Sequence, residues 1–397
     1  MSPLVLSRFT ATSCLGLGLR DLVDGLRNDR SGLAPCHFED VDLDTWIGVV
    51  PQIAATPLPN AWREFECRNN RLALLALTQD GFREAVAACV GRVGPRRVGL
   101  FIGTSTSGIL ETELAYRQRD PSTGALPASF RYFGTHNAFS VAAFTRGLLG
   151  LEGPAAVVST ACSSSAKAFA SAQRMIGLDL IDAAVVGGVD SLCLTTLYGF
   201  HSLQLTAARA CRPFAADRDG LSIGEAGAFA LLERPSSRDD ADSIALLGVG
   251  ESNDGYHLSA PHPEGLGARL AMRAALATAD IDPADVSYIN LHGTGTPSND
   301  SAEGAAVLAV FGAEAPCSST KGATGHTLGA AGALEAVISA TALRHNLIPG
   351  GASTATVDPS LRLNYITASL PRPLAHVLSN SFGFGGTNCS LLFGKLS

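Results

Sequence analysis

Cys162 is the side chain of this sequence best placed to act as a nucleophile. It follows the segment Val157-Val-Ser-Thr-Ala and precedes a run of small residues from Ala166 to Gly177. The first segment predicts a strand and turn, and the second predicts a helix, so the thiol is expected at a helix N-terminus. Amide groups there stabilise negative charge, which predicts a lowered thiol pKa and a reactive thiolate. A buried structural cysteine is the alternative for this motif alone.

Two histidines occupy comparable positions in the second part of the chain. His292 follows the apolar segment Val286–Leu291 and opens His-Gly-Thr-Gly-Thr-Pro, and His326 ends Thr320-Lys-Gly-Ala-Thr-Gly-His. Sites in α/β proteins gather where strands end. One such histidine would more often be structural, but two of them together with a cysteine in a third turn indicate a shared site.

A thiol and two histidines suit a small set of reactions. A thiolate with one histidine and an Asn or Asp would indicate a hydrolase, and a metal site would normally show closer ligand spacing, so no metal is expected. Two imidazoles that donate Nε2–H to a thioester carbonyl would stabilise the enolate formed when a malonyl group loses carbon dioxide. That carbanion can attack an acyl group held on the cysteine, which is a Claisen condensation with covalent catalysis.

The elements that position these residues alternate between strands and helices, which predicts an α/β protein with a mainly parallel sheet. A loop-rich insertion over residues 106–145 is expected to be functional or interfacial. Strands are expected at residues 98–102, 183–189, 228–233, 244–249, 286–291 and 389–393, and helices at residues 19–26, 71–89, 166–177, 268–279 and 327–336.

The polar segment over residues 234–243 separates two halves. Residues 1–240 would form the half with the nucleophilic cysteine, and residues 241–397 the half with both histidines. Each half contains a strand, a turn of Gly, Ser or Thr with a reactive side chain, and a helix of small residues. This parallel predicts a duplicated unit.

Composition excludes several classes of function. The 397 residues carry a net charge of −7 without a Lys/Arg run, which argues against nucleic-acid binding. Nine cysteines at irregular spacing, without a CxxC pair, do not resemble a disulfide framework or a zinc site, so a reducing cytoplasm is expected. No apolar run reaches the length of a membrane span, so no membrane insertion is expected. Only 16% of residues are charged, which suggests that a partner subunit covers part of the surface.

Four motifs in order along the chain together resemble those of the elongating β-ketoacyl-acyl-carrier-protein synthases, condensing enzymes of the thiolase superfamily. The motifs are Thr160–Ser165, His292–Pro297, Lys321–Gly332 and Asn380–Asn388, and the resemblance spans nearly the whole chain. It implies a thiolase-like fold with duplicated α/β halves in a layered αβαβα arrangement. It also implies decarboxylative condensation of a Cys-bound acyl group with malonyl-acyl-carrier protein.

The same resemblance implies partners and a pathway. Substrates would arrive on the phosphopantetheine of acyl-carrier protein, with no separate cofactor, and the chain would form a homodimer or a heterodimer with a related synthase-like subunit. Fatty-acid synthesis and specialised polyketide or polyene synthesis, such as that of aryl polyenes, both fit. The segment Phe9-Thr-Ala-Thr-Ser13 replaces the family's glycine-rich turn, so a dedicated pathway is an alternative to housekeeping fatty-acid synthesis.

Residue roles also follow from the matching motifs. Cys162 would accept the acyl chain, and His292 and His326 would hold the malonyl thioester carbonyl. Lys321 would help to fix His326 and the local electrostatics, with Glu335 in the supporting polar network.

Two further roles concern the backbone and the access to the site. The amides of Cys162 and Phe384 would form the oxyanion hole, and Phe384, in a glycine-rich loop, would gate the pocket.

Two alternatives to the elongating synthase stay open. A thioesterase or acyl hydrolase could use Cys162 and one histidine, and a non-catalytic subunit could shape the pocket of another synthase. Initiating synthases use Cys-His-Asn, so His326 favours elongation. Chain-length-factor subunits lack the nucleophile, which is present here. Cys389 does not reproduce the second catalytic cysteine of thiolases.

Overall fold

One extended sheet runs through the protein, and the computed structural model describes residues 2–237 and 239–396 of it. Its twelve strands include four parallel neighbours at one end, three at the other end, and antiparallel strands in the middle. They are β1 (Leu4–Ser13), β2 (Gly16–Leu17), β5 (Val98–Gly103), β6 (Ala155–Val158), β7 (Ala183–Asp190), β9 (Ala226–Glu233), β10 (Ile244–Asn253), β11 (Tyr288–Asn290), β12 (Pro316–Ser318), β14 (Asn364–Tyr365), β16 (His376–Gly383) and β17 (Thr387–Lys395).

Helices and two small sheets complete the described structure. The small sheets contain β3 (Leu33–Pro35), β4 (Trp46–Gly48) and β8 (Ile223–Gly224), and β13 (Leu347–Ile348) and β15 (Leu370–Pro371). The α-helices are α1 (Gly18–Arg27), α2 (Arg68–Leu77), α3 (Phe82–Val93), α4 (Ile109–Arg117), α5 (Ser140–Leu148), α6 (Ser164–Gly177), α7 (Leu194–Ser202), α8 (Leu266–Ala279), α9 (Pro297–Phe311), α10 (Lys321–Thr324) and α11 (Ala331–His345).

The two parts of the large sheet share one strand order. The first part reads β6-β5-β7-β9-β1, and the second reads β12-β11-β16-β17-β10, so corresponding strands occur in the same order along the chain. In each part three strands are parallel and two are antiparallel. The parts meet where β1 pairs with β10, with Leu4 opposite Leu246. The expected duplication of an α/β unit is confirmed.

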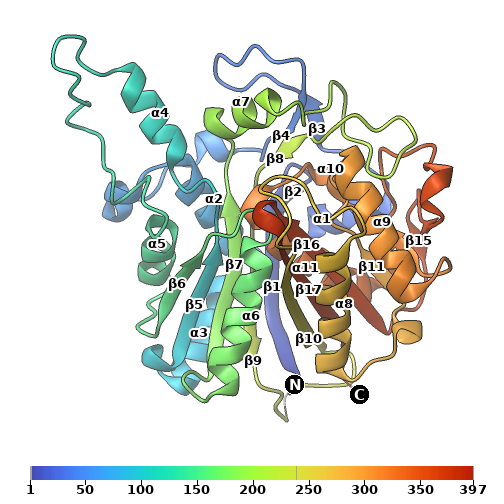
Figure 1. The fold of residues 1–397 in the computed structure, drawn as a ribbon. Coiled ribbons are helices and arrows are strands. Elements are labelled where there is room, and N and C mark those ends of the chain that lie inside the picture. The colour runs from blue at the N-terminus through green and yellow to red at the C-terminus, as the bar shows by residue number, and fades with distance from the viewer. Residues whose placement is uncertain (1, 238, 397) are drawn as a thin grey trace.

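Helices α6 and α11 lie between the two parts of the sheet and contact each other. Figure 1 shows α3 and α5 on one outer side and α8 and α9 on the other, where separate apolar cores hold them against the sheet. The five layers therefore follow the expected αβαβα order. Small residues permit the close central contact, since a Cβ on Gly332 of α11 would lie 2.6 Å from the backbone nitrogen of Ala166 in α6.

One local expectation was wrong. The helix expected over residues 71–89 is instead divided into α2 and α3, because Asp80 adopts a left-handed conformation (φ 56°) that ends the first helix. The insertion over residues 106–145 contains α4 and the start of α5 with loops between them, and the segment around α4 extends away from the body of the protein (Figure 1). Among the described residues, no helix is long and apolar enough to cross a membrane.

Candidate active site

Cys162 lies in the turn between β6 and α6, as the sequence predicts, and is 5% exposed. The residue before it, Ala161, has a left-handed backbone (φ 53°), which makes the turn sharp. The hydroxyl of Ser164 donates to the Ala161 carbonyl at 2.5 Å, and the amide of Thr160 donates to the same hydroxyl at 2.9 Å. The serines of this motif therefore hold the backbone that presents the thiol.

The expectation of a lowered thiol pKa is wrong for this site without substrates. Burial raises the pKa of Cys162 to about 11, because the thiolate would lose its hydration. The charge of Lys321 and the backbone amides of Phe384 and of Cys162 itself act in the opposite direction. Stabilisation by amides is thus present, but desolvation outweighs it. Cys162 is therefore a thiol at neutral pH.

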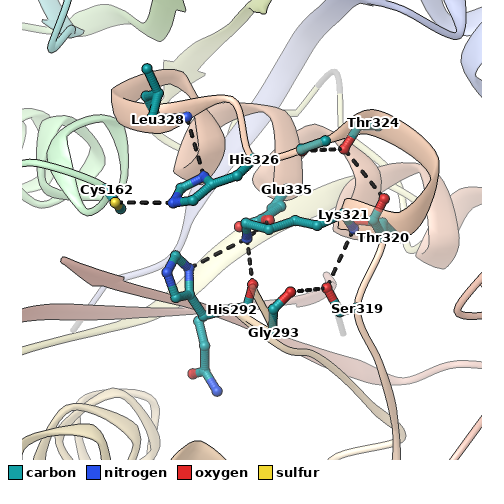
Figure 2. Close-up of polar contacts among 12 residues, drawn as sticks. Cys162, His292, Gly293, Ser319, Thr320, Lys321, Thr324, His326, Leu328 and Glu335 are labelled. Atoms are coloured by element: carbon teal, nitrogen blue, oxygen red, sulfur yellow. Dashed lines mark hydrogen bonds and ion pairs between the residues drawn. The ribbon is translucent and has the colours of Figure 1, made fainter. Parts of the chain in front are cut away.

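His326 follows α10 and is 1% exposed. Figure 2 shows its ring between Cys162 and the turn that follows it. The amide of Leu328 donates to Nδ1 of His326 at 3.2 Å, so the neutral ring carries its proton on Nε2. That Nε2 lies 3.0 Å from Sγ of Cys162. Burial, assisted by the charge of Lys321, holds the pKa of His326 well below its usual range.

His292 comes two residues after the end of β11, and its ring lies beside that of His326 at a centroid distance of 5.3 Å. Nζ of Lys321 lies 3.3 Å from Nδ1 of His292 and 2.5 Å from its carbonyl oxygen. An ammonium group only donates, so Nδ1 accepts and the proton of His292 is on Nε2. Burial is the largest cause that holds the pKa of His292 well below its usual range, and the charges of Lys321 and His326 add to it.

Lys321 and Glu335 form a fully buried ion pair (Figure 2). Burial raises the pKa of Glu335 to about 7, and the neighbouring ammonium group opposes that rise. Lys321 was expected to fix His326, but its ammonium group contacts His292 and Glu335. Its effect on His326 is electrostatic, since its charge lowers the pKa of that imidazole. Glu335 was expected in the supporting polar network, and its carboxylate binds this ammonium group.

Phe384 begins a short 3-10 helix (Phe384–Gly386) directly after β16. Its backbone amide lowers the pKa of the Cys162 thiol by hydrogen bonding, as an oxyanion-hole donor would. Its ring packs on Phe200 of α7 at a centroid distance of 5.6 Å. The amide of the next residue, Gly385, donates to the carbonyl of Leu258 at 2.7 Å. Phe384 therefore lies where a side chain could control entry to the thiol.

One pocket reaches all three reactive side chains, and Phe200, Phe382 and Phe384 line it together with Cys162, His292, His326 and threonines of the 294–296 turn. The ligand atoms of Cys162, His292 and His326 lie within 4.8 Å of one another. A metal would need a lone pair on the nitrogens that face the thiol, but both Nε2 atoms carry protons. The arrangement instead suits a carbonyl oxygen that gains negative charge.

Sequence reasoning missed Glu303, a buried residue of α9. Its carboxylate accepts from the amides of His292 and Gly293 at 2.7 Å each, and Asn380 donates to it at 3.2 Å. Burial raises the pKa of Glu303 to about 7. The signal was present in the sequence, since Glu303 lies on the helix that follows the His292 motif. It fixes the backbone that carries His292.

Two family models match the chain. Residues 71–238 match the model described as "Beta-ketoacyl synthase, N-terminal domain", and residues 244–354 match "Beta-ketoacyl synthase, C-terminal domain".

Individual proteins agree with these matches. Nodulation protein E of Rhizobium meliloti is 33% identical over 392 residues, which is 96% of each chain. The 3-oxoacyl-[acyl-carrier-protein] synthase 2 of Mycobacterium bovis is 37% identical over 250 residues, 59% of this chain and 60% of the relative. A solved structure titled "Ketosynthase (ApeO) in Complex with its Chain Length Factor (ApeC) from Xenorhabdus doucetiae" has a TM-score of 0.90 at 38% identity, covering 100% of this chain and 98% of the other.

Proposed function

Because the chain belongs to the β-ketoacyl synthase family of condensing enzymes, we propose that Cys162, His292 and His326 join an acyl group to a malonyl unit and release β-ketoacyl-acyl-carrier protein. The reaction serves fatty-acid or polyketide synthesis. The observation that carries these roles is the convergence of two Nε2–H donors on the pocket of the Cys162 thiol.

The first step transfers the acyl group. Sγ of Cys162 attacks the acyl thioester carbonyl, and the amides of Cys162 and Phe384 stabilise the oxyanion. When the tetrahedral intermediate collapses, the bond to the carrier sulfur breaks. The thiol proton of the enzyme ends on that departing sulfur, so the step balances without a further reactant.

The second step makes the carbon–carbon bond. The carbonyl oxygen of the malonyl thioester accepts hydrogen bonds from Nε2–H of His292 and of His326. Loss of carbon dioxide leaves its electron pair as an enolate on this carbonyl, which the two donors stabilise. The carbanion attacks the acyl carbonyl on Cys162, and the carbon–sulfur bond breaks. Lys321 keeps His292 in the required tautomer throughout.

The geometry disfavours a hydrolase. Beyond acylation of its cysteine, a cysteine hydrolase needs an imidazole nitrogen that takes a proton from the water that cleaves the acyl-enzyme. The nitrogen of His326 that faces Cys162 already carries a proton, because Nδ1 is occupied by the amide of Leu328. A purely pocket-shaping subunit would have no use for this set of donors around a thiol.

The proposal extends to partners and location. The names of the relatives include an acyl-carrier-protein synthase and a ketosynthase with its chain length factor, which supports acyl-carrier protein as substrate carrier and a related subunit as dimer partner, with no separate cofactor. The nine cysteines all lie in the described part of the chain and form no disulfide, which supports a cytoplasmic location. We place the boundary between the halves at residues 240 and 241, between β9 and β10.

Intact-protein mass spectrometry tests the proposal. The protein is incubated with a panel of acyl-carrier-protein thioesters and then with malonyl-carrier protein. An acyl adduct on Cys162, followed by carbon dioxide release and a β-ketoacyl product, is expected. Acyl release without carbon dioxide would indicate a hydrolase, and the absence of any adduct would indicate a non-catalytic subunit.

A further inference from the structure

Asp190 ends β7 and is fully buried beneath the site, with no assigned role. Its carboxylate accepts from the amides of Ser105 and Thr106 at 2.8 Å, and from the hydroxyls of Thr104 and Thr106 at 2.7 and 2.8 Å. Its second oxygen accepts from the amide of Gly329 at 2.5 Å. Asp190 therefore connects the turn after β5 to the turn after His326.

In the described part of the chain, backbone amides and side-chain hydroxyls, and not a cation, stabilise the charge of Asp190. Glu225 and Glu335 pair with Arg68 and Lys321, whereas among the described residues no cation forms an ion pair with Asp190. The amides that point at it can only donate, so both oxygens act as acceptors. A buried carboxylate satisfied in this way fixes the donors that satisfy it.

We propose that Asp190 is a positioning residue, which holds the turn after His326 so that Leu328 selects the tautomer of the catalytic imidazole. Leu328 has a left-handed backbone (φ 53°), a conformation that persists only where the surroundings impose it. Gly329, the next residue, is anchored by Asp190. With Gly329 fixed, the amide of Leu328 points at Nδ1 of His326 and Nε2–H points at the thiol.

The other side of Asp190 supports the nucleophile. Ser105, whose amide donates to Asp190, also places its hydroxyl 3.4 Å from the carbonyl of Ala161. Ala161 is the left-handed residue directly before Cys162. One carboxylate thus connects the turn of the nucleophile to the turn of the histidine donor.

Two substitutions test this role, which rests on the proposed function. Asp190→Asn removes the charge and replaces one acceptor oxygen by an NH₂ group. That group can only donate, and it would face backbone amides that also donate. Gly329→Ala keeps every charge, but its Cβ would lie 2.7 Å from Oδ2 of Asp190 and displace the contact. Asp182→Asn is the matched control, because Asp182 lies just before the opposite end of β7 and pairs with Arg97 near the surface.

The first measurement is the tautomer of His326, read by NMR of the ¹⁵N-histidine-labelled protein and assigned by its absence in His326→Gln. We expect the Nε2–H tautomer in the unaltered protein and in Asp182→Asn, and its loss in both test variants. This readout needs no substrate, so it stands even where the proposed condensation fails.

The second measurement is malonyl decarboxylation. We expect kcat to fall about 10- to 100-fold in both test variants, with KM changed less than about twofold. Unchanged tautomer and kcat in a folded Asp190→Asn or Gly329→Ala protein would overturn the role. Loss of folding in both variants, seen as loss of the thermal transition, would also overturn it, because Asp190 would then serve folding alone. Absence of decarboxylation in the unaltered protein would contradict the proposed function instead.

Discussion

Nε2 of His326 lies 3.0 Å from Sγ of Cys162, although 164 positions of sequence separate the two residues. The contact joins the two halves of the sheet, since the cysteine follows β6 and the histidine follows the equivalent strand β12 and its helix α10. The duplicated topology brings equivalent turns together, and each half supplies a different part of the proposed chemistry.

Replacement of the nucleophile separates the two steps. Cys162→Gln should abolish condensation, by at least about a thousandfold, because no thiol can hold the acyl group. Malonyl decarboxylation should continue, because His292 and His326 keep their donors. Product analysis and carbon dioxide release measured on the same samples check this. Persistent condensation would remove Cys162 from the mechanism.

Loss of either histidine should have the opposite effect. His292→Ala or His326→Ala should lower the decarboxylation rate about 100- to 1000-fold, the usual effect of removing one donor from a developing oxyanion. Acylation of Cys162 by acyl-carrier protein should continue, as measured by mass spectrometry. A decarboxylation rate within tenfold of the unaltered enzyme would show that the imidazoles do not hold the malonyl carbonyl.

The low histidine pKa values predict a flat pH dependence. Both imidazoles stay neutral well below pH 6.5, so their protonation should not reduce decarboxylation between about pH 6 and pH 8. Initial rates of carbon dioxide release in a constant-ionic-strength buffer series test this. A decline toward pH 6 that disappears in His292→Gln would contradict the assignment.

The thiol should react slowly at neutral pH. Because burial raises the pKa of Cys162 to about 11, its alkylation by iodoacetamide should accelerate about tenfold per pH unit from pH 7 to pH 10. Lys321→Met should move the profile to higher pH, since the ammonium group lowers this pKa. Peptide mass spectrometry of Cys162 gives the rates. A plateau near pH 8 would mean that desolvation does not control the thiol.

The buried ion pair should give a pH-dependent stability when one partner is removed. Lys321→Met leaves Glu335 without its cation, which raises the folded-state pKa of a carboxyl already near 7. Its unfolded pKa is near 4.5, so the variant should be most stable below about pH 4.5 and lose about 3–5 kcal/mol as pH rises through the folded-state pKa. Thermal melts at several pH values test this.

The double variant Lys321→Met with Glu335→Gln is the control for that experiment. It contains neither charge, so its melting temperature should lack the pH dependence that Glu335 gives to the single variant. A single variant that melts equally at acidic and neutral pH would contradict the coupling of Lys321 and Glu335.

Much of the fold could be predicted from the sequence because its signals are local. Apolar runs that end in Gly, Ser and Thr turns gave the central strands, and the small residues of α6 and α11 indicated close packing. The prediction of a single helix over residues 71–89 was wrong, because the left-handed Asp80 interrupts a continuous apolar pattern.

The sequence alone determined which residue types can react and in which turns they lie, and this was enough to propose Cys162, His292 and His326 as the reactive set. Only the tertiary structure decided that Lys321 contacts His292, that Leu328 sets the tautomer of His326, and that burial raises the thiol pKa. These properties depend on which atoms meet across the two halves and how much water they exclude. Distances and desolvation arise from packing between distant segments, which local patterns of residue type do not contain.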